Sequence, residues 1–383
     1  MHIFTYIDKD ATIYERNLGD KLLPTSQRQN QNTGLDSILE LSKYKIDSTY
    51  YNSRILLKFD EVNLSASLSS FGETLLTTSH SLRLYTSRVL EVPLKYDVYV
   101  HPVSESWEMG TGKLINSPVV QDGVSWKYKD GYFSGTGNQW ATGSFTYSTN
   151  AYYTTGSVNF GGTYYEGQNS GESQYTHIQS FEYETGDLNI DITNTVKQWH
   201  SNTFANEGLI IKRPTTNEVE DKPYGNLQFF SRDTHTIYIP RIDTKWDDSS
   251  FVTGTLSPIN MKADIVLYMR GIKREYKQVE TPKFNVTGRN RIPTKTYSTS
   301  SDYLTVTYLP ITTYYSVRDV STGEDVIGFD DYTKVSCDAG GNFFNFRMDT
   351  LQPERYYKFL FKVVSGSTTE VFDDNKFQFK VVR

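Results

Sequence analysis

Apolar and polar residues alternate along most of the chain, and runs of this kind recur from one end to the other. Alternation with a period of two places every second side chain on the same face, which is typical of a half-buried β-strand. Gly, Asn, Asp and Pro bound the runs, as expected for turns. The pattern predicts strands at residues 52–60, 82–86, 96–100, 209–212, 227–230, 236–240, 303–308, 357–363 and 377–381. The chain is therefore expected to be all-β.

One segment has a helical pattern instead. Ile192, Val196 and Trp199 are spaced i, i+4, i+7, which places them on one face of a helix. Asp191 and Thr193 are suitable capping residues at its start. We expect one short helix here, covering one end of a β-sandwich.

Composition agrees with this pattern and excludes several classes of protein. The 383 residues include 29 Tyr and 21 Phe, side chains that suit a pleated, half-buried surface. Cys337 is the single Cys, so a disulfide framework and a Cys-based zinc site are excluded, and we expect it to be a buried strand residue. No apolar run is long enough for a membrane span, and the first residues lack the features of a secretory signal. A net charge of -6 argues against a nucleic-acid partner.

Charge divides the chain into two regions. Residues 256–383 carry 18 basic and 15 acidic residues, a net charge of +3, whereas residues 1–255 carry 21 and 30, a net charge of -9. Turn-forming residues at 247–250 suggest a boundary near residue 250. Residues 251–295 are basic and are expected to be a linker or strands shared by two sandwiches. Within them, the basic stretch 270–295 could bind phosphates, but its charges are expected instead to be solvated or to oppose an acidic neighbour, either the first domain or another copy of the chain.

A Tyr/Gly-rich insertion is expected at residues 131–171. Its first 35 residues, 131–165, contain ten aromatic residues and no charged one. Structureless loops of this length are uncommon unless they are functional or disordered. The insertion could pack its own aromatic rings onto the sandwich, present them to a partner or glycan, or be disordered. If it is a contact surface, the candidate residues are Trp140, Tyr152, Tyr153, Tyr164 and Tyr165.

Motifs that carry chemistry are scarce. The six His residues form no metal-spaced pair and are expected to be structural or on the surface. There is no nucleophile elbow and no phosphate-binding loop, so we expect no catalytic residues, no enzymatic activity and no cofactor. A glycosidase-type pair of distant carboxylates stays open, as does a structural Ca²⁺. The acidic residues that could supply ligands to Ca²⁺ are Asp8, Asp10, Asp187, Asp191, Asp243, Asp247 and Asp248.

Eight short motifs follow one another in the first 250 residues. They are 10–14, 54–60, 82–85, 106–110, 124–126, 191–199, 206–212 and 231–233. The most specific is the Asp-led segment 191–199, which ends in Trp and is followed by Asn-Glu-Gly and an aliphatic run. In content and order these motifs resemble the DNRLRE-type module, a jelly-roll β-sandwich related to carbohydrate-binding modules.

The resemblance implies that residues 1–250 form a jelly-roll β-sandwich. It implies that Trp107, Trp126 and Trp199 are core or loop-packing residues rather than a platform for sugars. Arg54 and Arg232 would be buried, paired charges. The other residues that match the structural motif are Asp191 and Gly208.

The segment 351–359 contains Leu, Pro, Tyr357 and Phe at the spacing L-x-P-x-x-x-Y-x-F. This is similar to a corner of immunoglobulin and fibronectin type III-like domains, in which the tyrosine hydroxyl bonds back to the backbone. The resemblance implies an Ig/fibronectin-like β-sandwich at residues 296–383.

The Tyr- and Gly-rich, nearly Cys-free composition, without a secretory signal, resembles that of virion structural proteins of tailed bacteriophages. This implies a non-enzymatic component of the tail, neck or baseplate, made in the host cytoplasm and located in the virion. Its partners would be other virion proteins and copies of itself, reached through sandwich faces and the aromatic loop, with no membrane partner. The alternative is a carbohydrate-binding module that attaches to surface glycans.

Overall fold

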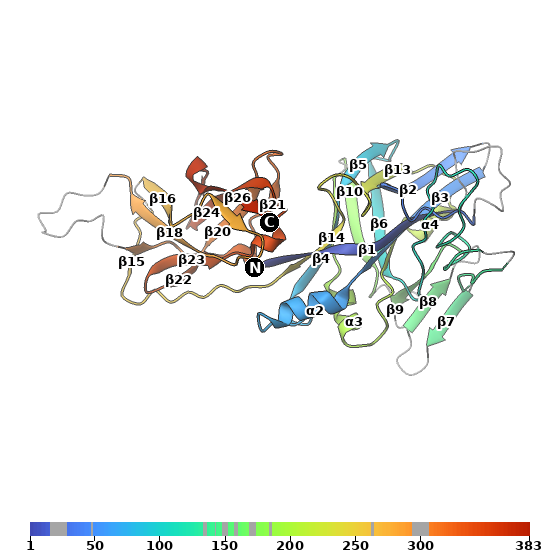
Figure 1. Cartoon of the computed structure of the whole chain (residues 1–383), viewed down its shortest axis with the longest axis horizontal. Coiled ribbons are helices and arrows are strands. Elements are labelled where there is room, and N and C mark those ends of the chain that lie inside the picture. Colours follow the sequence, from blue (N-terminus) through green and yellow to red (C-terminus); the bar gives the residue numbers. More distant parts are fainter. Residues whose placement is uncertain are drawn as a thin grey trace, which may run out of the picture. The chain divides into compact units, whose positions relative to one another are not determined.

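The computed structural model describes residues 1–15, 29–46, 49–132, 136–141, 143–147, 152–156, 160–167, 174–183, 186–261, 264–292 and 306–383. The fold is all-β, with antiparallel sheets and, within these residues, three short α-helices (Figure 1). The chain divides into two compact units, one formed by Phe4–Thr244 and the other by Met1–Ile3 and Lys245–Arg383. In the described residues no helix is long and apolar enough to cross a membrane.

The N-terminal unit is built mainly from strands that form one continuous, folded sheet and a separate three-stranded sheet. Its strands are β1 (His2–Tyr14), β2 (Ile38–Ile46), β3 (Thr49–Phe59), β4 (Ser79–Leu84), β5 (Thr86–Leu90), β6 (Lys95–Pro102), β7 (Gly143–Tyr147), β8 (Tyr152–Gly156), β9 (Thr163–Gly167), β10 (His177–Glu182), β11 (Leu188–Asp191), β12 (Leu209–Lys212), β13 (Gly225–Phe230) and β14 (Arg241–Lys245). Its helices are α2 (Glu61–Ser69), α3 (Thr193–His200) and α4 (Thr215–Val219).

Two long strands, β1 and β3, hold the large sheet together. The order is β10-β6-β12-β3-β1-β14-β4-β11, and β2, β13 and β5 continue from β3 in another direction. The β1–β3 register places Ala11 opposite Leu56 and Ile13 opposite Arg54. Apolar side chains of these strands pack with three tryptophans of the following loops into one buried cluster. β7, β8 and β9 form the small sheet, which begins inside the predicted insertion.

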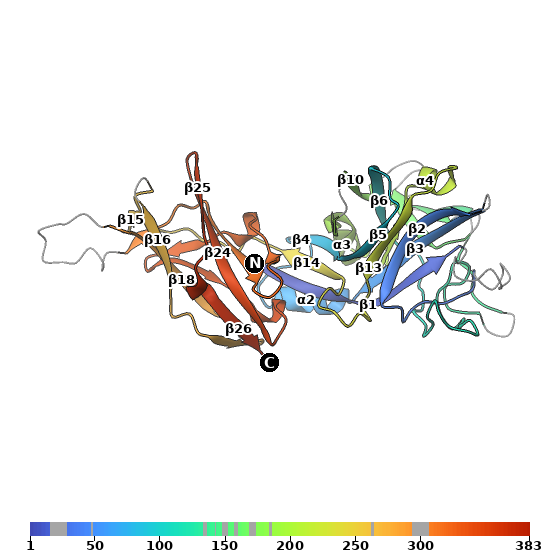
Figure 2. The ribbon, with the colours of Figure 1, turned by 90° about the horizontal axis from the view of Figure 1, so that it is seen from above.

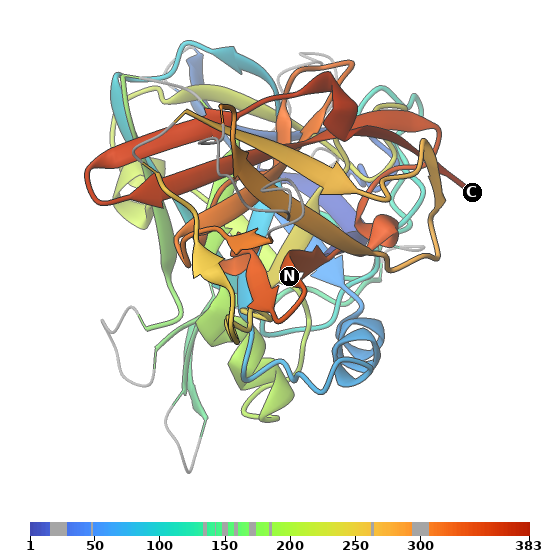
Figure 3. The same cartoon turned by 90° about the vertical axis from the view of Figure 1, so that its left-hand side faces the viewer.

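The predicted helix is present as α3, and its apolar face is buried as expected. Ile192, Val196 and Trp199 are all at most 3% exposed. Asp191 accepts a hydrogen bond from the backbone N–H of Thr193 at 2.8 Å, just before the helix begins. α2 lies at the same end of the unit as α3 (Figures 1 and 3).

The expectation of only one helix is wrong, because α2 and α4 are present as well. The N-cap of α2 is Asp60, which accepts the backbone N–H of Asn63 at 3.0 Å. Only Leu64 and Leu68 of α2 are buried, so its apolar stripe is too narrow to stand out in the sequence. α4 has only five residues, fewer than periodicity can detect.

The predicted strand at 236–240 is also wrong, because this segment is not extended into a sheet. The hydroxyl of Thr234 accepts the N–H of Thr236, and the hydroxyl of Thr236 accepts the N–H of Tyr238, at 3.3 and 3.2 Å. These local bonds replace the inter-strand ladder that the alternation of residues suggested. The neighbouring strand is β14, which begins directly after Pro240.

The C-terminal unit consists of a four-stranded sheet, a six-stranded sheet and a short two-stranded one. Its strands are β15 (Ser257–Pro258), β16 (Ile265–Arg270), β17 (Glu275–Lys277), β18 (Lys283–Asn290), β19 (Thr307–Tyr308), β20 (Thr313–Asp319), β21 (Asp325–Ile327), β22 (Ser336–Asp338), β23 (Gly341–Asn345), β24 (Arg355–Ser365), β25 (Thr368–Phe372) and β26 (Gln378–Val382). Short 3₁₀ turns are η2 (Asp331–Thr333), η3 (Met348–Thr350) and η4 (Asn375–Phe377). Figure 2 shows β24 beside β25 and β26, its two antiparallel partners.

Residues 251–295 form strands in their described part rather than a linker. β15 to β18 lie there, and all belong to the C-terminal unit. β16 and β18 contribute to the order β16-β18-β23-β22, and β17 pairs in parallel with β26 in the other sheet. Cys337 lies on β22 and is 1% exposed, so it is the buried strand residue that was predicted.

Aromatic rings fill the core of the C-terminal unit. Tyr315 and Phe344 stack at 4.4 Å between centroids, and Phe359 stacks on Phe379 at 4.8 Å. Phe284 meets Phe359 edge-on at 4.9 Å. These five rings are at most 3% exposed. A large share of the aromatic composition is therefore used in packing, where each ring buries a large apolar area.

The predicted tyrosine corner is present. The hydroxyl of Tyr357 donates to the carbonyl of Gln352 at 3.2 Å and accepts the N–H of the same residue at 3.1 Å. Tyr357 is 2% exposed, so this hydroxyl satisfies two backbone groups at a turn that packs against the core.

We expect Tyr357→Phe to lower the free energy of unfolding by about 1–2 kcal/mol, because both backbone groups of Gln352 lose this partner. Urea denaturation measures the change. Tyr356→Phe is the matched control, since Tyr356 is 49% exposed and its replacement should change stability by less than about 0.5 kcal/mol. Equal effects of the two substitutions would contradict the role given to the corner.

Candidate functional site

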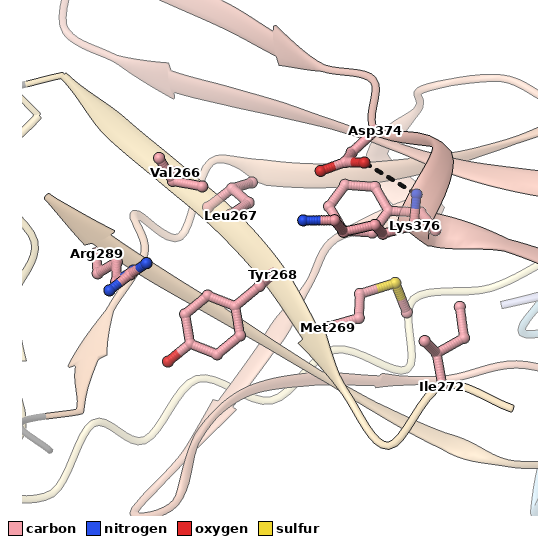
Figure 4. Close-up of a pocket in the computed structure, with 9 residues that line it drawn as sticks. Val266, Leu267, Tyr268, Met269, Ile272, Arg289, Asp374 and Lys376 are labelled. Carbon is pink, nitrogen blue, oxygen red and sulfur yellow. Dashed lines mark hydrogen bonds between the residues drawn. The ribbon is translucent and has the colours of Figure 1, made fainter. Parts of the chain in front are cut away.

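A cavity of about 330 Å³ opens in the C-terminal unit between strand β16 and the segment that carries η4. Apolar or aromatic side chains form most of its wall, namely Val266, Leu267, Tyr268, Met269, Ile272 and Phe377. Figure 4 shows Tyr268 and Arg289 toward one end, Met269 and Ile272 toward the other, and Asp374 and Lys376 across from β16. A volume near the lower end of the usual range for binding sites suits a small group or one or two side chains.

The charged groups of the cavity are two cations and one carboxylate. Arg289 and Lys376 line it, and both side chains are exposed. Asp374 accepts the backbone N–H of Lys376 at 2.9 Å, which caps η4 (Figure 4). Because Asp374 is the only carboxylate among the nine lining residues, the cavity offers no facing pair of carboxylates for glycoside hydrolysis. Its chemistry favours an apolar group accompanied by a negative charge.

Three of the five predicted contact residues are in the interior, so they cannot form a surface for a partner or glycan. Trp140 is 1% exposed, Tyr164 3% and Tyr165 8%. Trp140 donates its indole N–H to the carbonyl of Ser125 at 3.0 Å. Tyr165 stacks on Phe204, with centroids 4.5 Å apart. The insertion packs these rings onto the sandwich because an exposed indole or phenol ring would leave a large apolar area in water.

Tyr152 and Tyr153 are the remaining two contact residues. Both lie on β8, where the backbone pairs with β7 and β9. Their side chains lie outside what the structure describes, and their role as contact residues stays a prediction.

Replacing Trp140 by phenylalanine is expected to lower the free energy of unfolding by about 1–3 kcal/mol, because the carbonyl of Ser125 is then left without its buried donor. Thermal or urea denaturation of the purified chain checks this. A variant as stable as the parent but defective in binding a partner would instead support the contact role.

The tryptophans of the structural motif are buried, as the family resemblance implied. Trp107, Trp126 and Trp199 are 2–3% exposed. Trp107 donates its indole N–H to the carbonyl of Glu207 at 2.9 Å, next to Gly208. Gly208 has a φ of +95°, and a Cβ atom there would lie 2.1 Å from the carbonyl oxygen of Leu57, so only glycine fits.

Arg54 is a buried, paired charge, as predicted, and its partner is Glu218. Nε and Nη2 of Arg54 donate to the two carboxylate oxygens of Glu218 at 3.0 and 2.7 Å. The guanidinium also stacks over the ring of Trp126, 4.8 Å from its centroid. Arg54 is 4% exposed and Glu218 7%. Such a bidentate pair offsets the cost of removing both charges from water.

A second cation, Lys212, shares this carboxylate. Its ammonium lies 3.3 Å from Glu218 and donates to the carbonyl of Arg213 at 2.8 Å. Burial lowers the pKa of Lys212 to about 8, although Glu218 opposes this shift. Burial raises the pKa of Glu218, but Arg54 and Lys212 outweigh it, so the pKa lies below its ordinary value. Sequence analysis missed Lys212 and Glu218, since no local pattern marks either residue.

The prediction that Arg232 is a buried, paired charge is wrong, because its side chain is exposed. The fold uses its backbone instead: the N–H of Arg232 donates to Oδ2 of Asp10 at 2.6 Å. Asp10 is 1% exposed, and its other oxygen, Oδ1, has no hydrogen-bond partner in the part of the chain that the structure describes. The Ser-Arg-Asp motif therefore anchors the second half of β1 through a main-chain bond.

The Ca²⁺ candidates do not gather into one site. In the described residues no group of three or more His, Cys, Asp and Glu side chains could hold a metal ion. Three of the candidates accept backbone N–H bonds at turns or strand ends, namely Asp187, Asp191 and Asp247. Asp248 accepts the N-terminal ammonium of Met1 at 3.0 Å. Asp8 is exposed and Asp243 is half-buried.

Three of the histidines are structural. His80 and His101 are at most 1% exposed, and His177 donates to or accepts from Thr195 at 2.7 Å. Burial lowers the pKa of His80 and of His177 to about 4, and that of His101 well below its ordinary value. All three are neutral at physiological pH, which suits hydrogen bonding inside the sandwich.

The arrangement defines an all-β, two-unit protein with an apolar, partly cationic cavity in its C-terminal unit. No protein-family model matches the chain, and no curated protein matches it.

Proposed function

We propose that the chain is a non-enzymatic structural component of a tailed bacteriophage virion, in the tail, neck or baseplate. The N-terminal unit would be a jelly roll of the DNRLRE type and the C-terminal unit an Ig/fibronectin-like sandwich. The observation that carries the proposal is the position of the tryptophans: all five, Trp107, Trp126, Trp140, Trp199 and Trp246, are at most 4% exposed.

The burial of the tryptophans favours this proposal over the alternative, a carbohydrate-binding module. A carbohydrate-binding module stacks sugars on exposed, flat aromatic rings, and here the largest rings stabilise the cores. Among the described residues, the exposed aromatic candidates for such stacking are Tyr183 at 73%, Tyr356 at 49% and Phe71 at 37%. What the sandwiches do offer to neighbours is the backbone of the strands at the edges of their sheets. These surfaces suit permanent contacts with other chains of a particle.

Mass spectrometry of phage particles purified by density gradient tests the proposal. We expect peptides of this chain to co-purify with the tail proteins at a fixed ratio, and an antibody against it to label the tail, neck or baseplate. If the chain remains in the particle-free fraction, the proposal is wrong.

The carbohydrate-binding alternative has its own experiment. Binding of the full chain to a glycan array, lost in Tyr183→Ala and retained in Tyr99→Ala, would support it. No binding to any acidic or neutral glycan would count against it.

A further inference from the structure

The first observation is an open strand edge in the C-terminal unit. β16 is the end strand of its sheet and, among the described strands, pairs with β18 alone. The N–H of Arg291 donates to the carbonyl of Asp264 at 2.8 Å, at the start of this antiparallel pair. Because hydrogen-bonded and non-bonded pairs alternate along the ladder, the backbone groups of Leu267 and Met269 face away from β18.

The cavity lies along this same edge. Four consecutive residues of β16, from Val266 to Met269, line it. Successive side chains of a strand point to opposite faces, so a cavity that touches all four lies beside the strand rather than over one face. A strand added at this edge would therefore bond the outward backbone groups of Leu267 and Met269 and lie next to an apolar cavity. Two cations, Arg289 and Lys376, stand at this cavity (Figure 4).

The second observation is a matching edge in the N-terminal unit. Among the described strands β10 is an end strand whose ladder partner is β6, and the side chain of Gln179 accepts the N–H of Asn189 on the neighbouring β11 at 2.7 Å. The N–H of Tyr183 donates to the carbonyl of Leu94 at 2.8 Å, so the same alternation turns the backbone of Ile178, Ser180 and Glu182 outward. Ile178 is 48% exposed, and Ser180 and Glu182 are exposed as well.

The two edges are complementary in length, polarity and charge. Both β16 and β10 have six residues. β10 offers an apolar side chain, Ile178, and the exposed carboxylate of Glu182, which pairs at the surface with Lys95 at 2.6 Å, whereas the edge of β16 offers an apolar cavity and two cations. The net charges of the two regions are opposite as well. Residues 1–255, which contain β10, have a net charge of -9, and residues 256–383, which contain β16, have a net charge of +3. Opposite charge favours their encounter over pairing of like edges.

We propose that copies of this chain assemble head to tail, with the edge of β16 in one copy pairing with the edge of β10 in the next. Backbone hydrogen bonds join the two strands, Ile178 enters the cavity, and Glu182 faces Arg289 and Lys376. Because each copy carries both edges, the contact is heterologous and extends into a ring or a filament. This inference rests on the proposed function and deepens it, since it names the partner and the surfaces used.

Proline substitutions at the outward positions test the pairing, because proline removes the N–H that an added strand needs and is tolerated at strand edges. The variants are Met269→Pro and Ser180→Pro, with Met269→Ala and Ser180→Ala as matched controls that keep the N–H. Analytical ultracentrifugation over a range of concentrations measures association. We expect the parent chain and both alanine controls to form oligomers that weaken in high salt, and each proline variant alone to remain a monomer.

A mixture of the two proline variants gives the sharpest result. The edge of β10 is intact in Met269→Pro, and the edge of β16 is intact in Ser180→Pro. The mixture should therefore form one-to-one dimers and nothing larger. Circular dichroism confirms that each variant is folded. If a proline variant does not fold, lysine at the same position replaces it, since a charged side chain also disfavours edge pairing.

Two results would overturn the inference: a parent chain that is monomeric at every concentration, or proline and lysine variants that associate as the parent does. The proposed function fails separately. A chain that is present in purified particles but monomeric in solution would overturn head-to-tail pairing alone. A chain that associates as described but is absent from particles would overturn the virion assignment alone.

Discussion

Replacing Glu218 by glutamine is expected to lower the free energy of unfolding by about 3–5 kcal/mol, because two buried cations then lose their shared carboxylate. Arg54 is 4% exposed and Lys212 1%, so water cannot replace the missing charge. A loss of this size is a large part of the stability of a typical domain. Urea denaturation of the full chain, followed by tryptophan fluorescence, measures it.

The matched control for this prediction is Glu220→Gln. Glu220 also lies next to α4, but its side chain is 33% exposed; its carboxylate pairs with Lys222 at 3.7 Å and accepts the hydroxyl of Tyr224. Its replacement should change stability by less than about 1 kcal/mol. If Glu218→Gln leaves too little folded protein to measure, Glu218→Asp keeps the charge and should retain part of the stability. A loss below about 1 kcal/mol for Glu218→Gln would contradict the network.

A double variant separates the ion pair from its surroundings. The double variant Arg54→Met with Glu218→Met removes one cation and the carboxylate at the same time. Its loss of unfolding free energy should therefore be smaller than the sum of the losses in the two single variants. Additive effects would mean that the two side chains stabilise the unit independently of each other.

The network also marks the limit of what could be predicted from the sequence. Arg54 was recognised because it stands in a strand motif, whereas Glu218 lies 164 residues further on, in a helix of five residues. Periodicity describes which face of an element is buried, but not which distant side chain meets it. The pairing of Arg54 and Lys212 with Glu218 depends on how the fold brings β3, β12 and α4 together, which the sequence pattern does not describe.

Several regular elements were predictable because the interactions that define them join residues close together in the sequence. Alternation identified the long strands β3, β6 and β24 but not β1, β2, β18 and β20, and the spacing of Ile192, Val196 and Trp199 identified α3. The bond from Tyr357 to Gln352 spans only five residues, so a short motif contained both partners. Strand 236–240 failed for the opposite reason: threonine hydroxyls compete for the backbone, and this competition does not alter the pattern of apolar residues.

The aromatic insertion shows why burial of irregular segments is hard to predict. An uncharged run of Tyr, Trp and Gly is compatible with a core and with a contact surface, since both bury aromatic area. Trp140 and Tyr164 are core residues because strands β1, β3 and β12 provide the apolar surface beneath them. That surface comes from distant parts of the chain, so no feature within residues 131–171 could decide between the alternatives.

Asp10 is expected to make the protein less stable as the pH rises from about 4 to 7. Burial raises the pKa of Asp10 from its ordinary 3.8 to about 7, and the nearby Asp233 and Asp36 act in the same direction. In this window the folded chain holds a proton that the unfolded chain has released. The corresponding stability is complete below pH 3.8 and is lost as the pH rises through about 7. A pKa raised from 3.8 to about 7 corresponds to roughly 4 kcal/mol.

Asp10→Asn isolates this effect, because asparagine resembles the protonated acid and can still accept the N–H of Arg232. The quantity to measure is the free energy of unfolding of the variant minus that of the parent, at several pH values from 4 to 8. We expect the difference to increase steadily with pH, by roughly 4 kcal/mol in total. Taking the difference removes the contributions of His80, His101 and His177, which are the same in both proteins.

Asp221→Asn is the control for Asp10→Asn, since the Asp221 side chain is 74% exposed and pairs with Lys45 at the surface. It should give a much smaller dependence on pH, because solvent screens an exposed carboxylate. A flat difference for Asp10→Asn would mean that the carboxylate is ionised in the folded chain across the whole range. Oδ1 of Asp10, which has no hydrogen-bond partner among the described residues, would then have to be stabilised by a positive charge or by water, and not by a proton.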